Sequence, residues 1–153
     1  MLDSNINKPL MLGAFFSAVA ALAHLGCIIF GGDWYRFFGA GEQMALMAEA
    51  GEYYPTIVTS VLVLVLSIWS IYGLSGARLI IKLPFIRTAL VLISSIYVLR
   101  GVVFVVLMPM FPENSITFWF VSSAICLSIG MLYSVGTYQS WSKLSVKYAI
   151  QGA

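Results

Sequence analysis

Four long apolar stretches constrain this chain more than any other feature. They cover residues 10–32, 55–77, 88–108 and 116–138, and a helix needs roughly 20 apolar residues to cross a bilayer. The stretches are continuously apolar and do not alternate with polar residues, which favours spanning helices over barrel strands. Only 9% of the residues are charged, against about 25% in soluble domains. We therefore expect an all-α fold: a four-helix transmembrane bundle forming one integral membrane domain over residues 1–153.

The first stretch requires a separate test, because residues 21–24 (ALAH) resemble the small-residue site at which a signal peptide is cut. The positive charge before it is weak, since Lys8 is offset by Asp3. The apolar run also continues past this site to Phe30, further than the core of a signal peptide would extend. We therefore expect the stretch to be retained as the first membrane helix.

Charged residues are sorted between the two sides that this topology defines. The side with both termini and the loop between the second and third stretches holds Lys8, Arg78, Lys82, Arg87, Lys143 and Lys147. The other side holds Arg36 together with Asp33, Glu42, Glu49, Glu52 and Glu113. Lys and Arg of short loops collect in the cytoplasm, so we expect both termini to be cytoplasmic and the location to be the bacterial cytoplasmic (inner) membrane. The basic face is expected to contact anionic lipid, not nucleic acid.

The longest segment outside the stretches joins the first stretch to the second on the outer side. Its residues 42–50 (EQMALMAEA) are strong helix formers, and Gly51 suits a helix C-terminus. The pattern predicts a short interfacial helix over about residues 42–50, which would bring carboxylates to the outer mouth of the bundle. A solvated acidic loop that binds no ligand is the alternative.

Arg100 is the most unusual residue of the third stretch. It lies about 8 residues, roughly 12 Å along a helix axis, from the predicted outer end, and His24 lies at a similar depth in the first stretch. Tyr97 is one turn before Arg100. The same depth is reached in the other two stretches at Thr59, Ser60, Ser122 and Ser123. A buried arginine in a bilayer is costly, at least about 2.5–3.5 kcal/mol, so we expect this polar layer to face the interior of the bundle.

The partner of Arg100 remains open at this point, because no Asp or Glu falls inside any stretch. Either a loop glutamate reaches in and forms a structural lock, or the arginine anchors a ligand; snorkelling to the interface is the third option. The candidate glutamates are Glu42, Glu49, Glu52 and Glu113. His24 either makes a local hydrogen bond or serves the pocket as a ligand or proton relay.

The sequence lacks the residues that several classes of membrane protein require for their function. There is no CxxC motif, and Cys27 and Cys126 differ in depth by roughly 9 Å, so neither a disulfide nor quinone-linked thiol chemistry is expected. The glutamate that small multidrug transporters carry in their first helix is missing, as are a histidine cluster for metal and a phosphate-binding loop. No cofactor is implied; haem or a quinone stays a remote option.

The leading hypothesis is a small polytopic membrane protein with an outward-facing intramembrane polar pocket that binds or passes a small ligand. That ligand would be an anion, a lipid head group or a quinone-like carbonyl. The predicted site is Arg100, His24, Tyr97, Thr59 and Ser122, gated or neutralised by Glu49 or Glu52. The alternatives are a structural or accessory subunit, in which Arg100 pairs with a loop glutamate, and, third, a membrane enzyme. The expected partners are membrane lipids, with a homo-oligomer or another membrane protein as a further option.

Overall fold

The computed structural model describes residues 6–145, and every regular element in that range is a helix. The long helices are α1 (Lys8–Phe30), α4 (Tyr53–Gly76), α5 (Ile86–Val102) and α7 (Ile116–Ser145). The short ones are α2 (Gly32–Phe37), α3 (Glu42–Glu49), α6 (Phe104–Leu107) and the 3₁₀ helix η1 (Met108–Met110). The all-helical prediction is confirmed for this range.

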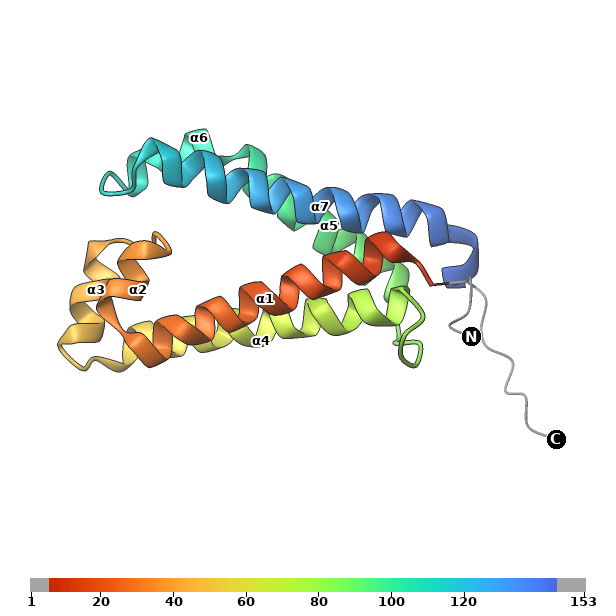
Figure 1. Ribbon diagram of the computed structural model, residues 1–153, viewed down its shortest axis with the longest axis horizontal. Coiled ribbons are helices and arrows are strands. Elements are labelled where there is room, and N and C mark those ends of the chain that lie inside the picture. Colours follow the sequence, from red (N-terminus) through yellow and green to blue (C-terminus); the bar gives the residue numbers. More distant parts are fainter. Residues whose placement is uncertain (1–5, 146–153) are drawn as a thin grey trace.

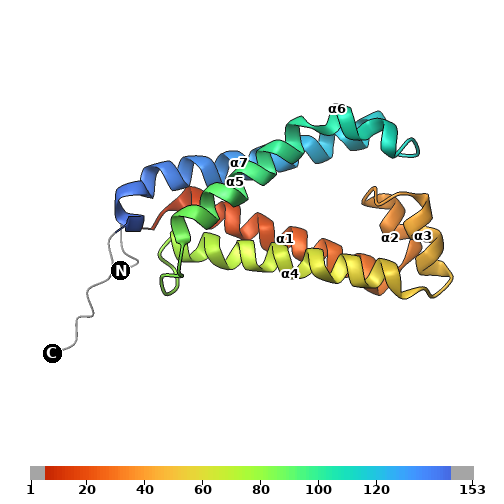
Figure 2. The same cartoon turned by 180° about the vertical axis from the view of Figure 1, so that it is seen from behind.

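Two long hairpins make up the molecule. α1 lies along α4, and α5 lies along α7, and most tertiary contacts fall within these two pairs. Figures 1 and 2 show the hairpins together at the end where α1 begins and apart at the other end, where α2 and α3 lie. We call these the basic end and the acidic end, because Lys8, Arg78 and Lys143 lie at the first and Asp33, Glu42 and Glu49 at the second.

Close approach of helices explains the pairing within each hairpin. In the first, the Ser70 hydroxyl on α4 donates to the Ala14 carbonyl on α1 (2.8 Å), and a Cβ added to Gly73 would lie 2.8 Å from the Cβ of Ala14. In the second, Gly101 of α5 faces Leu127 of α7, and Gly130 of α7 faces Val98 of α5. Small residues at these crossings let the backbones pack closely, as in other membrane helix pairs.

A polar cluster joins the two hairpins toward the basic end. The Ser17 hydroxyl on α1 lies 2.9 Å from the hydroxyl of Tyr97 on α5 and 3.2 Å from that of Tyr133 on α7. Tyr133, with 0% of its surface exposed, donates to the Trp69 carbonyl on α4 (2.9 Å). All four long helices therefore meet in one buried and hydrogen-bonded cluster, which is how buried hydroxyls are stabilised.

The third predicted helix is interrupted, which corrects the expectation of one helix over residues 88–108. α5 ends at Val102, and the α6–η1 segment continues at an angle of 59° to it. Val103 leaves the helical conformation (φ −79°, ψ 2°), and Pro109, without an N–H, lies in η1. Three helices are long and apolar enough to cross a membrane, and the bent pair would make a fourth if it counts as one span.

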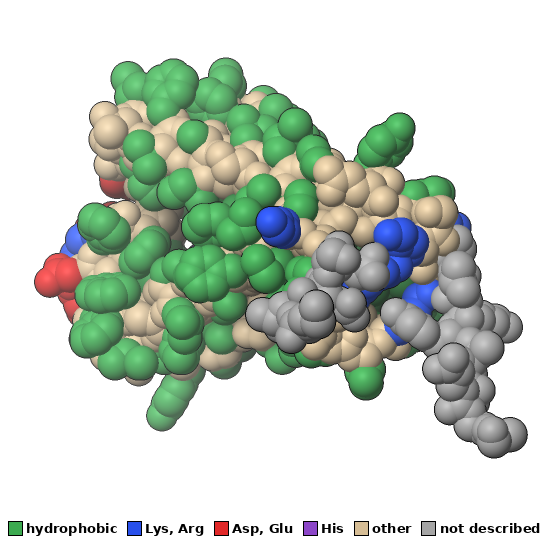
Figure 3. Space-filling view, turned by 45° about the vertical axis from the view of Figure 1, so that its right-hand side comes forward, with side chains coloured by type: hydrophobic (Ala, Val, Ile, Leu, Met, Phe, Trp, Pro, Cys, Tyr) green, Lys and Arg blue, Asp and Glu red, His purple; other side chains and the backbone are tan. Residues whose placement is uncertain are grey.

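The surface of the long helices is predominantly apolar. Large exposed side chains include Phe15 and Leu22 on α1, Leu64 on α4 and Ile125 on α7. In Figure 3 hydrophobic side chains cover much of the visible face, while Lys and Arg gather on the right and Asp and Glu on the left. Such a surface is compatible with insertion into a membrane, because a hydrocarbon environment satisfies apolar side chains.

Candidate functional site

Arg100 lies in the last turn of α5, near the point where the third stretch bends. A cation is favourable there, because the last carbonyl groups of a helix carry partial negative charge. The carbon at the centre of the guanidinium lies 5.5 Å from the centre of the Trp119 ring on α7. Trp119 is only 3% exposed. The charge is therefore held between α5 and α7 over an aromatic face, a geometry that attracts cations.

The guanidinium has unused hydrogen-bonding capacity. Its Nη1 atom is buried and has no hydrogen-bond partner among the described residues, and the same is true of the Ser123 hydroxyl, one turn after Trp119 on α7. A buried donor without a partner costs about 1–3 kcal/mol, and more when it is charged. A buried polar atom of this kind can bond to a polar ligand atom or a water. The Thr137 hydroxyl, further along α7, is a third such atom among the described residues.

Four other residues predicted to share the layer with Arg100 use their polar atoms elsewhere. His24 lies 2.8 Å, through Nδ1, from the Ala20 carbonyl of its own helix, and Ser122 donates to the Trp119 carbonyl of its own helix (3.2 Å). Thr59 donates to the Tyr35 hydroxyl (3.1 Å). Tyr97 belongs to the cluster with Ser17. Among the described contacts, none of these four side chains hydrogen-bonds to Arg100.

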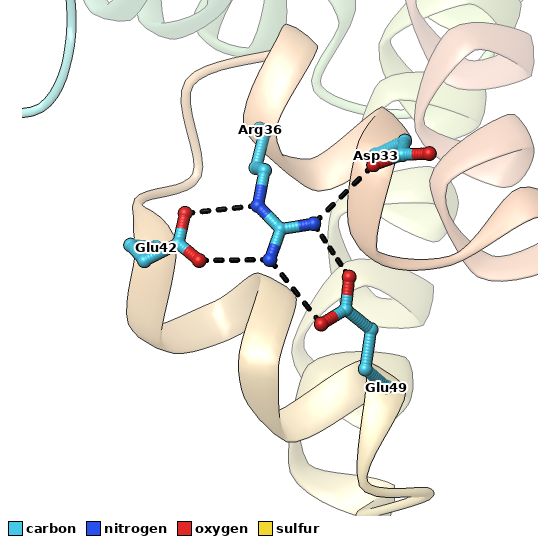
Figure 4. A network of polar contacts seen from close by, with 4 residues as sticks. All are labelled: Asp33, Arg36, Glu42 and Glu49. Carbon is cyan, nitrogen blue, oxygen red and sulfur yellow. Dashed lines mark hydrogen bonds and ion pairs between the residues drawn. The ribbon is translucent and has the colours of Figure 1, made fainter.

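The predicted gate residues form no ion pair with Arg100 among the described contacts. Arg36 of α2 binds the two carboxylates of α3: Nε and Nη2 donate to Glu42 (2.9 and 2.7 Å), and Nη1 and Nη2 donate to Glu49. A fifth bond reaches Asp33 (3.3 Å), as Figure 4 shows. Glu49 therefore neutralises Arg36 in this structure. Glu52 is exposed just before α4.

The Arg36 network shifts the pKa of its members in the direction expected for charge-assisted hydrogen bonds. Bonds from Arg36 lower the pKa values of Glu42 and Glu49, and the same bonds raise the pKa of Arg36. The three charges therefore stay ionised at neutral pH. The network ties α2 to α3 and shapes the predicted helix over residues 42–50, which is present as α3.

The α2–α3 unit bridges the two hairpins at the acidic end. It is held to the first hairpin by the Tyr35–Thr59 bond, and on the other side Asn114, in the loop before α7, donates to the Gly39 carbonyl (3.0 Å). A cavity of about 220 Å³ lies at this junction, lined by Arg36, Gly41, Glu42, Glu113 and Asn114. The unit thus covers the end at which the hairpins diverge.

Several small residues of α1 and α7 lie in contacts within the chain. Gly13 of α1 lies against the Tyr133 ring, and Gly130 of α7 lies against Tyr97 and Val98. Ser17, between them, is fully buried in the hydroxyl cluster. These three residues therefore contribute to the packing of the hairpins against each other.

Three residues of these contacts were missed by sequence reasoning. From its position near the end of a stretch, Trp119 is expected in the belt of aromatic residues at the membrane interface. Its spacing from Ser123, one helical turn later, nevertheless places both residues on one face of α7. Arg36 carried a usable signal, because it is the single cation among five carboxylates on the acidic side. Tyr133 is a phenol well inside the fourth stretch, where a hydroxyl needs a partner.

Comparison with known proteins adds no assignment to this geometry. No family model, no curated protein and no solved structure matches the chain.

Proposed function

We propose that this chain is an integral membrane protein that binds a small ligand at Arg100, between α5 and α7, and receives it from the acidic end or from the surrounding lipid. The proposed topology has both termini in the cytoplasm and the acidic end outside, with a bacterial cytoplasmic membrane as the location. The distribution of Lys and Arg supports this orientation.

The observation that carries the proposal is the buried Nη1 atom of Arg100, which has no acceptor among the described residues. Two of the candidate partners of Arg100, Glu42 and Glu49, form ion pairs with Arg36. A ligand oxygen at this point would satisfy the guanidinium donor, and Ser123 could contribute a second bond. Trp119 would supply an apolar face beside the polar contact.

Charge at the acidic end narrows the class of ligand. That end carries Asp33, Glu42, Glu49, Glu52 and Glu113 against Arg36. Its net negative charge repels a soluble anion that approaches from water. A molecule that is dissolved in the membrane and carries a carbonyl or acidic oxygen avoids this barrier. We therefore place an apolar carbonyl compound of the quinone type, or a lipid head group, ahead of a free anion.

The test compares wild type with Arg100→Leu and Arg100→Lys in detergent, by thermal unfolding with and without a probe. The probes are decylbenzoquinone, decanoate and a phospholipid extract. We expect at least one probe to raise the unfolding temperature of wild type. Arg100→Leu should lose that response while unfolding at a higher temperature without probe, because it removes an uncompensated buried donor.

Arg100→Lys separates the effect of the guanidinium shape from that of its charge, because lysine keeps the positive charge but lacks the planar set of N–H donors. We expect a reduced response to the probe in this variant. Lys82→Gln, at the basic end, is the matched control and should respond like wild type. If Arg100→Leu folds and responds to every probe as wild type does, the proposal is wrong.

A further inference from the structure

A second polar cavity lies at the basic end, far from Arg100 along the hairpins. Its volume is about 320 Å³. The lining residues are Ile6, Asn7, Lys8, Pro9, Arg78, Gln139, Ser140 and Lys143. They come from the start of α1, the residue after the C-cap of α4 and the last turns of α7. The cavity therefore forms only when three helix ends are brought together.

The charge of this cavity is uncompensated within the described structure. Lys8, Arg78 and Lys143 are its charged lining residues, and none of the described lining residues is acidic. Like charges gathered around one cavity raise its potential and attract an anion. All the carboxylates of the described residues belong to the acidic end, at the opposite ends of the same helices.

One wall of the cavity is fixed by Asn7. Its Nδ2 donates to the Gly136 carbonyl (3.0 Å) and to the Ser140 hydroxyl (2.7 Å), and its Oδ1 accepts from the Leu10 amide (2.9 Å). The amide is thus fully used in joining α1 to α7. Ser140 accepts the bond from Asn7, so its own hydrogen can be donated to an anion in the cavity.

Arg78 has a backbone conformation that is unfavourable for any residue with a side chain. It has φ +67°, and the Leu79 amide bonds the Leu74 carbonyl (3.0 Å) in the pattern that closes a helix. Glycine is the usual residue there, because a side chain is strained in the left-handed conformation. Arg78, in this strained conformation, is one of the residues that line the cavity.

We propose that this cavity binds the phosphate group of an anionic phospholipid, held by Lys8, Arg78 and Lys143. It lies at the ends of helices that are long and apolar enough to span a membrane, which is the level of lipid head groups. Arg87 stacks on Trp141 at this end, 4.5 Å from ring centre to guanidinium carbon, and tryptophan favours the same level. Basic pockets between helix ends on the cytoplasmic side are suited to such head groups.

The proposal rests on membrane insertion, which the proposed function also requires, but not on the Arg100 site. The experiment is native mass spectrometry of the purified full chain in a neutral detergent. The probes are dioleoyl phosphatidylglycerol, dioleoyl phosphatidylcholine and inorganic phosphate. We expect one phosphatidylglycerol to bind in preference to phosphatidylcholine, and Arg100→Leu to bind it as wild type does.

Two variants test the site residues. Arg78→Gly should weaken phosphatidylglycerol binding about fivefold, the effect of one cation near a lipid surface, while leaving the unfolding temperature unchanged or higher. Lys143→Gln, at an exposed residue of α7, should weaken binding by a similar factor, and it keeps the test valid if Arg78→Gly does not fold. Lys82→Gln removes a cation from the same end without touching the cavity and should bind like wild type.

Three results would overturn the proposal. One is equal binding of the two phospholipids. A second is a loss of binding in Lys82→Gln as large as in Arg78→Gly, which would indicate attraction to the whole basic end. The third is stabilisation of wild type by inorganic phosphate together with no preference for phosphatidylglycerol, which would make a soluble phosphate the ligand.

Discussion

Arg36 and Arg100 show how differently one side chain can be stabilised within the same half of a molecule. Arg36, outside the long helices, donates to Asp33, Glu42 and Glu49. Arg100, at the end of α5, has the Trp119 ring beside it and a buried Nη1 that finds no acceptor in the described part of the chain. The first arginine is satisfied by its own chain. The second has capacity left for something else, which is why we place the ligand there.

At the same scale, Tyr133→Phe tests the hydroxyl cluster that joins the hairpins. The change removes the donor to the Trp69 carbonyl and the contact with Ser17. We expect the free energy of unfolding in mixed micelles to fall by about 1 kcal/mol, the net value of a typical hydrogen bond. Tyr138→Phe, on the same helix but 85% exposed, should change it by less than about 0.5 kcal/mol. Equal effects would show that the cluster does not stabilise the fold.

At the scale of elements, the α2–α3 unit is held by both apolar packing and charge. Cys27, Tyr35 and Ala45 form its buried apolar cluster, with Phe38, Ala40, Met44 and Ala48 packed against it, while Arg36 spans both helices. Such a unit is sensitive to pH in a way that the long helices are not, because its stability depends on ionised carboxylates.

Acidification is therefore expected to loosen α3. The pKa values of Glu42 and Glu49 are lowered from 4.5 in the native state, so their ion pairs favour the folded unit above pH 4.5. That contribution declines as the pH falls below 4.5 and is lost below the lowered native values. Carbon-13 NMR of the glutamate carboxyl groups measures these pKa values directly. In Arg36→Gln both should return toward 4.5; unchanged values would contradict the role of Arg36.

At the scale of the whole molecule, the ends differ in charge and the long helices between them are apolar. This asymmetry underlies the proposed orientation, with the acidic end outside. Single-cysteine variants in a background without Cys27 and Cys126 test it with a membrane-impermeant maleimide. Glu113→Cys should label in intact cells, whereas Lys143→Cys should label only after the membrane is opened. Labelling of both without permeabilisation, or of Lys143→Cys alone, would reverse or reject the topology.

The sequence predicted the long helices better than the site. The helices α1, α4 and α7 follow from apolar length alone, since a continuous apolar run has few other solutions in lipid. The break at Val103 was missed because apolarity continues through it. The prediction of a common polar layer depends on depth along straight and parallel helices. Depth does not say which way a side chain faces, and His24 is bonded to a carbonyl of its own helix.

The position of the hydroxyl cluster around Tyr133 has a mechanical consequence. It fastens both hairpins toward one end, whereas among the described residues the opposite tips meet at the α2–α3 unit, where Asn114 donates to the Gly39 carbonyl and the Phe118 ring lies against Gly39. From Ser17 to Phe30 the first lever arm is about 20 Å long at 1.5 Å per residue. A pivot of about 5° at the tyrosines thus displaces the tip by about 2 Å, comparable to a one-to-two-ångström helix shift. Leverage of this kind converts a slight repacking around Tyr133 into a change in the distance between the tips of the two hairpins.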